Sequence, residues 1–415
     1  MKISKNPYIW NSIAGIINAS QAIILGMVIT RTNGLGDAGI LALAFSLGNL
    51  FMNVGHFGVR KFQVTDVKNE YSFSDYFSIR ILTVALMLLA CGLYLLIVGR
   101  SRAYDFSKVI TILMMCCIYA MESMEDVFWG FYQLKNRLDI GGKIFSIRWL
   151  CIMGAVSGVL YWKQNLLLAS VVGVVVSGLV LCISLAITYP SFRETIKWKT
   201  TKHSFGIIKA CFPLFLAGFL SYYVTSSPKY AIDKYFNSEV QACYSFVSMP
   251  VFVIDLLNMF LYMPILVSMA GEWETGNVEA FLKRIKRQVL FIVGISGACL
   301  LGGFFLGIPV LSVLYGVELT EYKGVLMLLL GAGAFLAFSG FFVTVLTILR
   351  KQFVAMGIYG IAALFALLFM NPMMQKHGLE GGVIYYILLM AAISVAYLVC
   401  IIVFITKKKK GMHDE

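Results

Sequence analysis

The segment that decides the fold class is Lys209–Phe236, KACFPLFLAGFLSYYVTSSPKYAIDKYF, where an uncharged run ends abruptly in charge. No formal charge lies between Lys209 and Lys229, and Asp233 and Lys234 follow shortly after. An apolar run of this length crosses the roughly 30 Å hydrocarbon core of a bilayer as a helix. A helix also satisfies its own backbone hydrogen bonds there. The segment therefore predicts a membrane-spanning helix with a charged end.

The same pattern recurs along the whole chain. The protein is 60% hydrophobic and only 13% charged, with a mean hydropathy of +0.83. Soluble domains are about 25% charged. The composition therefore predicts an all-α, multi-pass integral membrane protein. We expect about twelve spans, at residues 8–29, 37–58, 78–98, 108–131, 144–162, 166–188, 208–229, 240–264, 289–314, 324–348, 353–371 and 382–405.

The basic residues predict the orientation of these spans. If the N-terminus is cytoplasmic, 25 of the 34 lysines and arginines fall at the cytoplasmic side, with Arg80 and Arg148 counted among them at helix ends. Such a bias is the usual signature of the inner face. We therefore expect both termini in the cytoplasm.

Two polar segments organise the chain further. The stretch 189–206, YPSFRETIKWKTTKHSFG, separates a lobe of spans 1–6 (residues 1–200) from a lobe of spans 7–12 (residues 201–415). Two such halves of equal topology are typical of transporters built from parallel repeats. The second segment, 271–288, GEWETGNVEAFLKRIKRQ, predicts an amphipathic surface helix before the ninth span.

Ionisable residues inside spans are functional candidates, because a charge at mid-bilayer costs about 2.5–3.5 kcal/mol even on the most lenient scale. His56 and Arg60 are spaced i and i+4, so we expect them on one helix face at the inner end of the second span. They suit a phosphate group; the alternative is an ordinary interfacial anchor whose charged head reaches water.

Glu122, Glu125 and Asp126 have the spacing i, i+3 and i+4 near the inner end of the fourth span. Repulsion among three neighbouring carboxylates favours the uptake of a proton or another cation. The alternative is that they form ion pairs at the membrane surface. Their basic partners would then be Lys135, Arg137 or Arg148.

In the opening segment, Lys229 and Asp233 are one helical turn apart, and Pro228 removes a backbone donor and bends the helix. A lysine at a bend can direct its ammonium group toward an anion; the alternative is a surface ion pair worth less than about 1 kcal/mol. Asp255 is a lone acid in the eighth span, and we expect Lys229 to be its partner.

The sequence offers no enzyme signature. It contains no phosphate-binding loop, no nucleophile elbow and no HExxH metal motif, and no predicted loop is large enough to hold a soluble active site. We therefore expect no catalytic activity, cofactor or metal. The net charge of +13 is spread over short loops rather than gathered in one patch, so we expect no nucleic-acid partner.

Several stretches together resemble the Wzx-type polysaccharide flippases of the MOP exporter superfamily, which also contains lipid II flippases and MATE exporters. The stretches are 30–66, 73–83, 122–143, 213–266, 346–352 and 376–390, beginning with TRTNGLGDAGILALAF and ending with KHGLEGGVIYYILLM. They occur in order along nearly the whole length of the chain. The resemblance implies a MATE-like fold of two six-helix lobes around a central cavity.

The resemblance also implies a function: flipping a polyprenyl-diphosphate-linked oligosaccharide from the inner to the outer leaflet of a bacterial inner membrane. This would serve cell-surface polysaccharides such as lipopolysaccharide O-antigen, beside glycosyltransferases and a polymerase. Diphosphate and sugar contacts are then expected at Lys229, Arg60, His56, Arg31 and Tyr230. Residues expected to set the field or couple to ions are Glu122, Glu125, Asp126, Asp233 and Asp255.

Three other functions remain open. A MATE-like, cation-coupled drug or metabolite exporter requires carboxylates free to bind cations in the first lobe. A structural membrane protein has no need for charge inside its spans. A glycosyltransferase or polymerase that uses polyprenyl substrates is expected to carry a long outer loop, and no predicted outer segment here is long.

Overall fold

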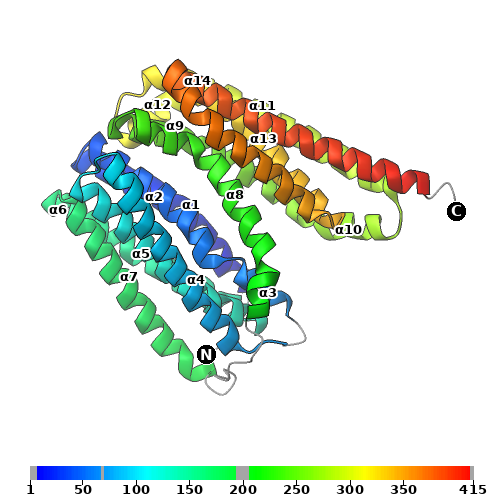
Figure 1. The fold of residues 1–415 in the computed structure, drawn as a ribbon, viewed down its shortest axis with the longest axis horizontal. Helices are drawn as coiled ribbons and strands as arrows, with labels where there is room; N and C mark the ends of the chain where they lie inside the picture. The colour runs from blue at the N-terminus through cyan, green and yellow to red at the C-terminus, as the bar shows by residue number, and fades with distance from the viewer. Residues whose placement is uncertain (1–6, 67–69, 193–204, 412–415) are drawn as a thin grey trace. The chain divides into compact units, whose positions relative to one another are not determined.

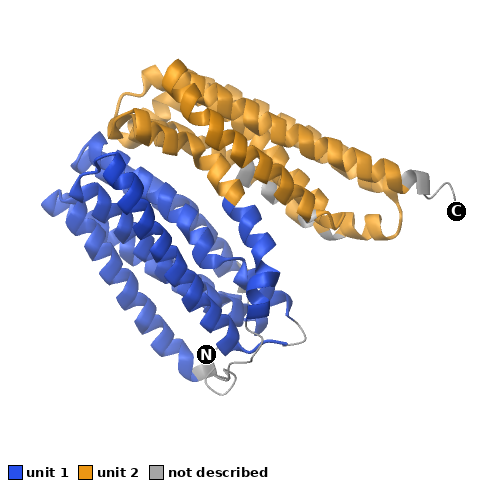
Figure 2. Ribbon diagram, viewed as in Figure 1, with its two compact units in different colours: residues 1–219 blue, residues 220–415 orange. Residues whose placement is uncertain are grey.

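The structure, a computed structural model, describes residues 7–66, 70–192 and 205–411. These residues form helices and no strand (Figure 1). The chain divides into two compact units, Met1–Phe219 and Leu220–Glu415 (Figure 2). Helix α8 (Phe205–Tyr235) begins in unit 1 and ends in unit 2, whereas lobes of residues 1–200 and 201–415 were predicted.

Unit 1 holds seven helices besides the start of α8. They are α1 (Pro7–Thr32), α2 (Leu35–His56), α3 (Val59–Thr65), α4 (Phe73–Tyr94), α5 (Phe106–Leu134), α6 (Leu138–Lys163) and α7 (Leu166–Thr188). Helix α5 is central, because it packs against α2, α3, α4, α6 and α7. These neighbouring helices are therefore the source of counter-ions for charged side chains on α5.

Unit 2 continues with α9 (Ser238–Tyr262), α10 (Leu266–Glu274), α11 (Val278–Gly302), α12 (Ile308–Tyr315), α13 (Lys323–Ile348) and α14 (Gln352–Gly411). Helix α13 is its central element and packs against α9, α11 and α14. A buried amide chain links three of these helices. Gln288 donates to Asn258 (2.7 Å), and Asn258 donates to the carbonyl of Ala337 (3.0 Å).

Side-chain caps fix where several helices begin. Ser72 and Asp75 form a reciprocal capping box at the start of α4. Asn165 accepts a hydrogen bond from the backbone of Leu168 at the start of α7, and Asn277 caps α11 in the same way. Each cap satisfies a backbone N–H that the first helical turn leaves without an internal partner.

The outer surface confirms a membrane protein. Leu96, Phe305 and Leu368 are 69%, 69% and 62% exposed, and many other large apolar side chains are similarly uncovered. Apolar surface on this scale, spread over long apolar helices, is what contact with lipid requires. Ten helices among the described residues are long and apolar enough to cross a bilayer.

The predicted number of twelve spans is approximate, for two reasons. The last candidate, Phe353–Lys408, has 56 residues, and Gly378 inside it leaves the helical conformation (φ 68°, ψ −162°), so α14 consists of two helices. Helix α9 contributes a shorter apolar stretch, Ser238–Ile254. The all-α membrane fold class is confirmed. The polar divider at 189–206 lies, from 193 to 204, outside the described residues, as do Lys2 and Lys5 of the orientation count.

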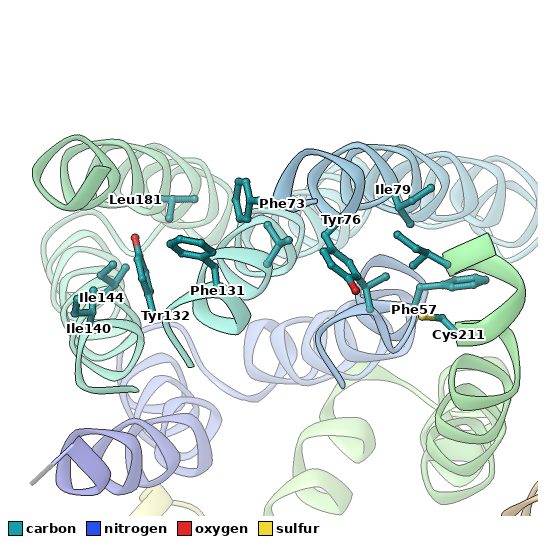
Figure 3. Close-up of a cluster of buried hydrophobic side chains, with 13 residues drawn as sticks. Phe57, Phe73, Tyr76, Ile79, Phe131, Tyr132, Ile140, Ile144, Leu181 and Cys211 are labelled. Atoms are coloured by element: carbon teal, nitrogen blue, oxygen red, sulfur yellow. The ribbon is translucent and has the colours of Figure 1, made fainter. Parts of the chain in front are cut away.

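A cluster of buried apolar side chains packs between the helices of unit 1 (Figure 3). It includes Phe73 and Ile79 of α4, Phe131 of α5 and Cys211 of α8. Phe57, which follows α2, stacks on Phe215 of α8 with ring centroids 4.4 Å apart. The first turns of α8 are thereby fixed to unit 1.

Gly142 lets α1 and α6 approach closely. A Cβ atom there would lie 2.6 Å from the carbonyl oxygen of Trp10, a backbone atom that cannot turn aside. We predict that Gly142→Ala destabilises the protein by about 1–3 kcal/mol, the usual range for overpacking. Thermal unfolding of the detergent-purified protein measures this.

Gly154→Ala is the matched control, because this glycine lies on the same helix with open space around its Cβ position. It should leave the unfolding temperature unchanged or raise it slightly, since alanine favours helix. Equal stability of the two variants would refute the close α1–α6 contact.

Candidate functional site

Three acidic side chains of α5 lie inside unit 1. Glu122 and Glu125 are 8% and 2% exposed, and the side chain of Asp126 is 13% exposed. Helix α5 is continuous through these positions, so the spacing i, i+3 and i+4 places them near one another as predicted. Their partners come from the helices on either side.

Arg148 of α6 neutralises the first two acids. Its Nη2 lies 3.2 Å from Glu122 and its Nε 2.7 Å from Glu125. The same guanidinium donates to Ser177 of α7 (3.2 Å), and Trp149 donates its indole N–H to Glu122 (2.8 Å). Arg148 is fully buried, so one side chain connects three helices away from water.

Asp126, the third acid, is neutralised by arginines of α4 and α3. Arg80 of α4, also fully buried, lies 2.7 Å from Asp126 and donates to the carbonyl of Gly55 (2.5 Å). Arg60 of α3 approaches the same carboxylate at 3.4 Å. Asp126 therefore has two cationic neighbours, and the guanidinium group of Arg80 lies closer to it than that of Arg60.

Arg60 forms the accessible end of this network. Its side chain is 25% exposed, donates to Gln133 (3.0 Å) and lies over the ring of Trp129, 4.4 Å from its centroid. A guanidinium has five N–H donors in a planar fork. Arg60 is the cation of the network best placed to accept a further anion.

Taken together, three cations and three carboxylates form a charge network, defined here as Arg60, Arg80, Arg148, Glu122, Glu125 and Asp126. Its formal charge is zero, so burial is compensated internally. Removing one member of such a network leaves an unpaired buried charge, which typically costs about 3–5 kcal/mol. The arrangement holds α3, α4, α5, α6 and α7 in register.

The sequence prediction was wrong about the helix that was to carry both His56 and Arg60. Helix α2 ends at His56; Phe57 (φ 45°) and Gly58 (φ 70°) then adopt left-handed conformations, and Arg60 belongs to α3. The two residues therefore do not share one helix face. The side-chain Nε2 of His56 is buried and has no hydrogen-bond partner among the described residues.

Sequence reasoning missed Arg80 and Arg148, which were assigned to the membrane surface. Both lie within helices and are fully buried. A signal for them was present: each arginine ends the same tetrapeptide, Phe-Ser-Ile-Arg, at 77–80 and 145–148. The two copies lie on α4 and α6, which pack on either side of α5 and supply its counter-ions.

Arg31 does not join this network. It lies exposed in the last turn of α1, and α2 then runs 22 residues to His56. At 1.5 Å per residue, the length of α2 places Arg31, which precedes the helix, about 33 Å from the end of the helix where Arg60 follows. Arg31 and Arg60 therefore lie at opposite ends of unit 1.

The remaining candidates lie in unit 2. Lys229 of α8 follows buried Ser226, Ser227 and Pro228 and is itself partly buried. Within the part of unit 2 that the structure describes, it has no hydrogen-bond or ion-pair partner, and the predicted one-turn pair with Asp233 does not form. Among the described side chains of unit 2, Lys229 is thus a cation without a counter-ion.

Tyr230, Asp233 and Asp255 are the other three candidates of unit 2. The ring of Tyr230 stacks on Tyr223, with centroids 6.0 Å apart. Asp233 lies one turn beyond Lys229 and is partly buried. Asp255 belongs to α9, but its side chain lies outside the described residues, so its pairing with Lys229 stays a prediction.

The central role of Arg148 gives a direct test. We predict that Arg148→Met lowers the stability of the protein by about 3–5 kcal/mol, because Glu122 and Glu125 lose their shared cation. Adding Glu122→Gln and Glu125→Gln to this variant should restore most of the loss, since no buried charge is then unpaired.

Lys163→Met, at the exposed end of the same helix, is the control and should behave as wild type. The measurement is thermal unfolding in detergent. An Arg148→Met protein as stable as wild type would show that the charge network does not hold the helices together.

No family model matches the chain, and no curated protein sequence matches it. Among the described residues, no group of His, Cys, Asp and Glu is placed to hold a metal ion. Likeness is found instead at the level of solved structures.

Three solved structures illustrate this likeness. An inward-facing multidrug resistance MATE family transporter of the MOP superfamily has a TM-score of 0.70 at 13% identity, covering 98% of this chain and 99% of that one. The lipid II flippase MurJ, in an inward closed conformation, has a TM-score of 0.70 at 13% identity, covering 96% and 90%. The MATE transporter VcmN of Vibrio cholerae, in a bent form, has a TM-score of 0.61 at 12% identity, covering 95% and 94%. The chain therefore has the fold shared by MATE transporters and MurJ.

Proposed function

We propose that this chain is a membrane transporter that moves a polyprenyl-diphosphate-linked oligosaccharide from the inner to the outer leaflet by alternating access. The fold supports the transporter class, because it matches exporters and a lipid flippase over nearly the entire chain. The observation that carries the choice of an anionic cargo is that Lys229 has no counter-ion among the described residues of its unit.

The chemistry of the cargo fits such a cation. A diphosphate loses its hydration when it leaves water, and an ammonium or guanidinium group compensates for that loss through charge-assisted hydrogen bonds. The polyprenyl tail can remain in the bilayer throughout. Lys229 is partly buried and has no counter-ion among the described side chains of its unit, so an incoming phosphate would supply a partner.

Arg60 is a second phosphate candidate for a related reason. Arg80 alone gives Asp126 a close counter-ion at 2.7 Å, whereas Arg60 lies 3.4 Å away and is partly exposed. An arriving phosphate could bind Arg60 without leaving Asp126 uncompensated. His56, Arg31 and Tyr230 are further candidates for contact with the headgroup or sugars.

The charge network favours transport of a lipid-linked oligosaccharide over the alternative function, cation-coupled drug export. Such a protein needs a carboxylate that is free to exchange a proton or a drug cation. Here Glu122, Glu125 and Asp126 are each bonded to an arginine. The proposed role of these acids is therefore to set the local field and hold the helices.

The proposed setting is the bacterial inner membrane, with both termini in the cytoplasm. A glycosyltransferase must supply the lipid-linked oligosaccharide, and a polymerase or ligase must consume it, because the flipped product is an activated sugar donor. In a bacterium that makes O-antigen or a similar polymer, this chain would act between those two steps.

Lys229→Ala tests the proposal. We predict loss of at least about tenfold in the translocation of a lipid-linked oligosaccharide, because a charge-assisted contact to phosphate is removed. The measurement is the appearance of labelled oligosaccharide in the outer leaflet of proteoliposomes, read by accessibility to an added lectin. Lys229→Arg should retain most activity, since the positive charge remains.

Lys234→Ala provides the matched control: it removes the same charge from an exposed position five residues further along α8. Full activity of Lys229→Ala would refute the anionic-cargo proposal. Efflux of a cationic drug that survives in Lys229→Ala but fails in an Asp126→Asn protein that still unfolds cooperatively in detergent would instead support the drug-exporter alternative.

A further inference from the structure

Helix α11 presents two chemically different faces. Its buried side is a regular apolar and amide stripe that includes Phe281, Ile285, Gln288 and Ile292. The exposed side carries a different set at helical spacing, with three cations followed by two apolar residues: Lys283, Lys286, Arg287, Leu290 and Phe291. Residues at i, i+3, i+4, i+7 and i+8 share one face of a helix.

The three cations of this face, here called the basic stripe (Lys283, Lys286 and Arg287), have no carboxylate within ion-pair distance among the described residues. Glu279 lies one turn before Lys283 on the same face and forms no ion pair with it. Arg287 instead lies against the ring of Phe291, 5.3 Å from its centroid.

Other cations near this end of unit 2 are engaged within the protein. Arg284 pairs with Glu272 of α10 at 2.6 Å. Lys408, near the end of α14, lies over the ring of Trp273 at 3.9 Å. The basic stripe thus differs from its neighbours, because its charges point outward and stay without an internal counter-ion.

The apolar part of the face continues directly from the stripe. Leu290 is 71% exposed and Phe291 is 41% exposed, one turn beyond Arg287. The candidate span that contains α11 runs from Val278 to Tyr315, 38 residues, or about 57 Å of helix, which is longer than the hydrocarbon core requires. The stripe therefore lies where the helix enters the bilayer, at the level of lipid phosphates.

We propose that the basic stripe and the apolar residues beyond it form a binding site for an anionic phospholipid of the surrounding membrane, of the phosphatidylglycerol type. The phosphate lies against Lys283, Lys286 and Arg287, and an acyl chain follows Leu290 and Phe291. This site is separate from the transport of cargo and does not depend on the proposed function.

The combination of the two parts identifies the ligand as a lipid. A free phosphate ion would use the cations and gain nothing from exposed Leu290 and Phe291. A zwitterionic lipid would use the apolar surface, but its choline or ethanolamine group would meet three like charges. An anionic phospholipid satisfies both parts, as basic segments next to spans commonly do.

The test is a titration of the purified full chain with phosphatidylglycerol in detergent micelles, with bound lipids counted by native mass spectrometry. Wild type should bind phosphatidylglycerol in preference to phosphatidylcholine. The variant Lys283→Gln/Lys286→Gln/Arg287→Gln should lose about a hundredfold in affinity for phosphatidylglycerol, because each cation at an anionic headgroup strengthens binding roughly fivefold. Thermal unfolding should be unchanged, since the three side chains are exposed.

The matched control is Arg350→Gln/Lys351→Gln/Lys407→Gln, which removes equal charge from exposed positions outside the stripe. It should bind phosphatidylglycerol as wild type does. Inorganic phosphate at millimolar concentration should not displace the lipid. The proposal is overturned if the stripe variant keeps wild-type affinity, if both triple variants lose it equally, if phosphatidylcholine binds as well, or if inorganic phosphate displaces the lipid.

Discussion

Charge inside an apolar helix bundle must be neutralised by another side chain, because no bulk water is available to solvate it. In unit 1 this constraint falls on α5, which carries three acids and packs against five other helices. Arg148 of α6 and Arg80 of α4 supply the positive charges that neutralise these acids. This ion pairing fixes the positions of α4 and α6 along α5, since an axial shift of either helix would separate its arginine from the α5 carboxylates.

The two units treat buried charge differently. Unit 1 balances its acids internally and leaves Arg60 at the accessible end of the network. Unit 2 uses a neutral amide chain, from Gln288 through Asn258 to the backbone of α13, to join its helices. Unit 2 also contains Lys229, which has no counter-ion among the described residues of that unit. This contrast is the basis of the framework role proposed for the charges of unit 1 and of the phosphate-binding role proposed for Lys229.

Much of the site was predictable where local spacing decides the geometry. Glu122, Glu125 and Asp126 were placed on one face of α5 because a continuous helix fixes i, i+3 and i+4 positions. The same argument failed for His56 and Arg60, since Phe57 and Gly58 interrupt the helix between them. A glycine permits this break, but the stacking of Phe57 on Phe215, 158 residues along the chain, accompanies it in the folded protein.

The sequence by itself determined that the chain is an all-α membrane protein, because a bilayer admits only long apolar helices and sets their length. It also determined which residues could carry chemistry, since ionisable groups inside such helices are few. Only the tertiary structure decided which of them are neutralised. Arg80 and Arg148 look like surface anchors in the sequence, yet the packing of α4 and α6 against α5 buries both beside carboxylates. The physical reason is that ion pairing depends on distances between side chains far apart in sequence, which helix packing alone sets.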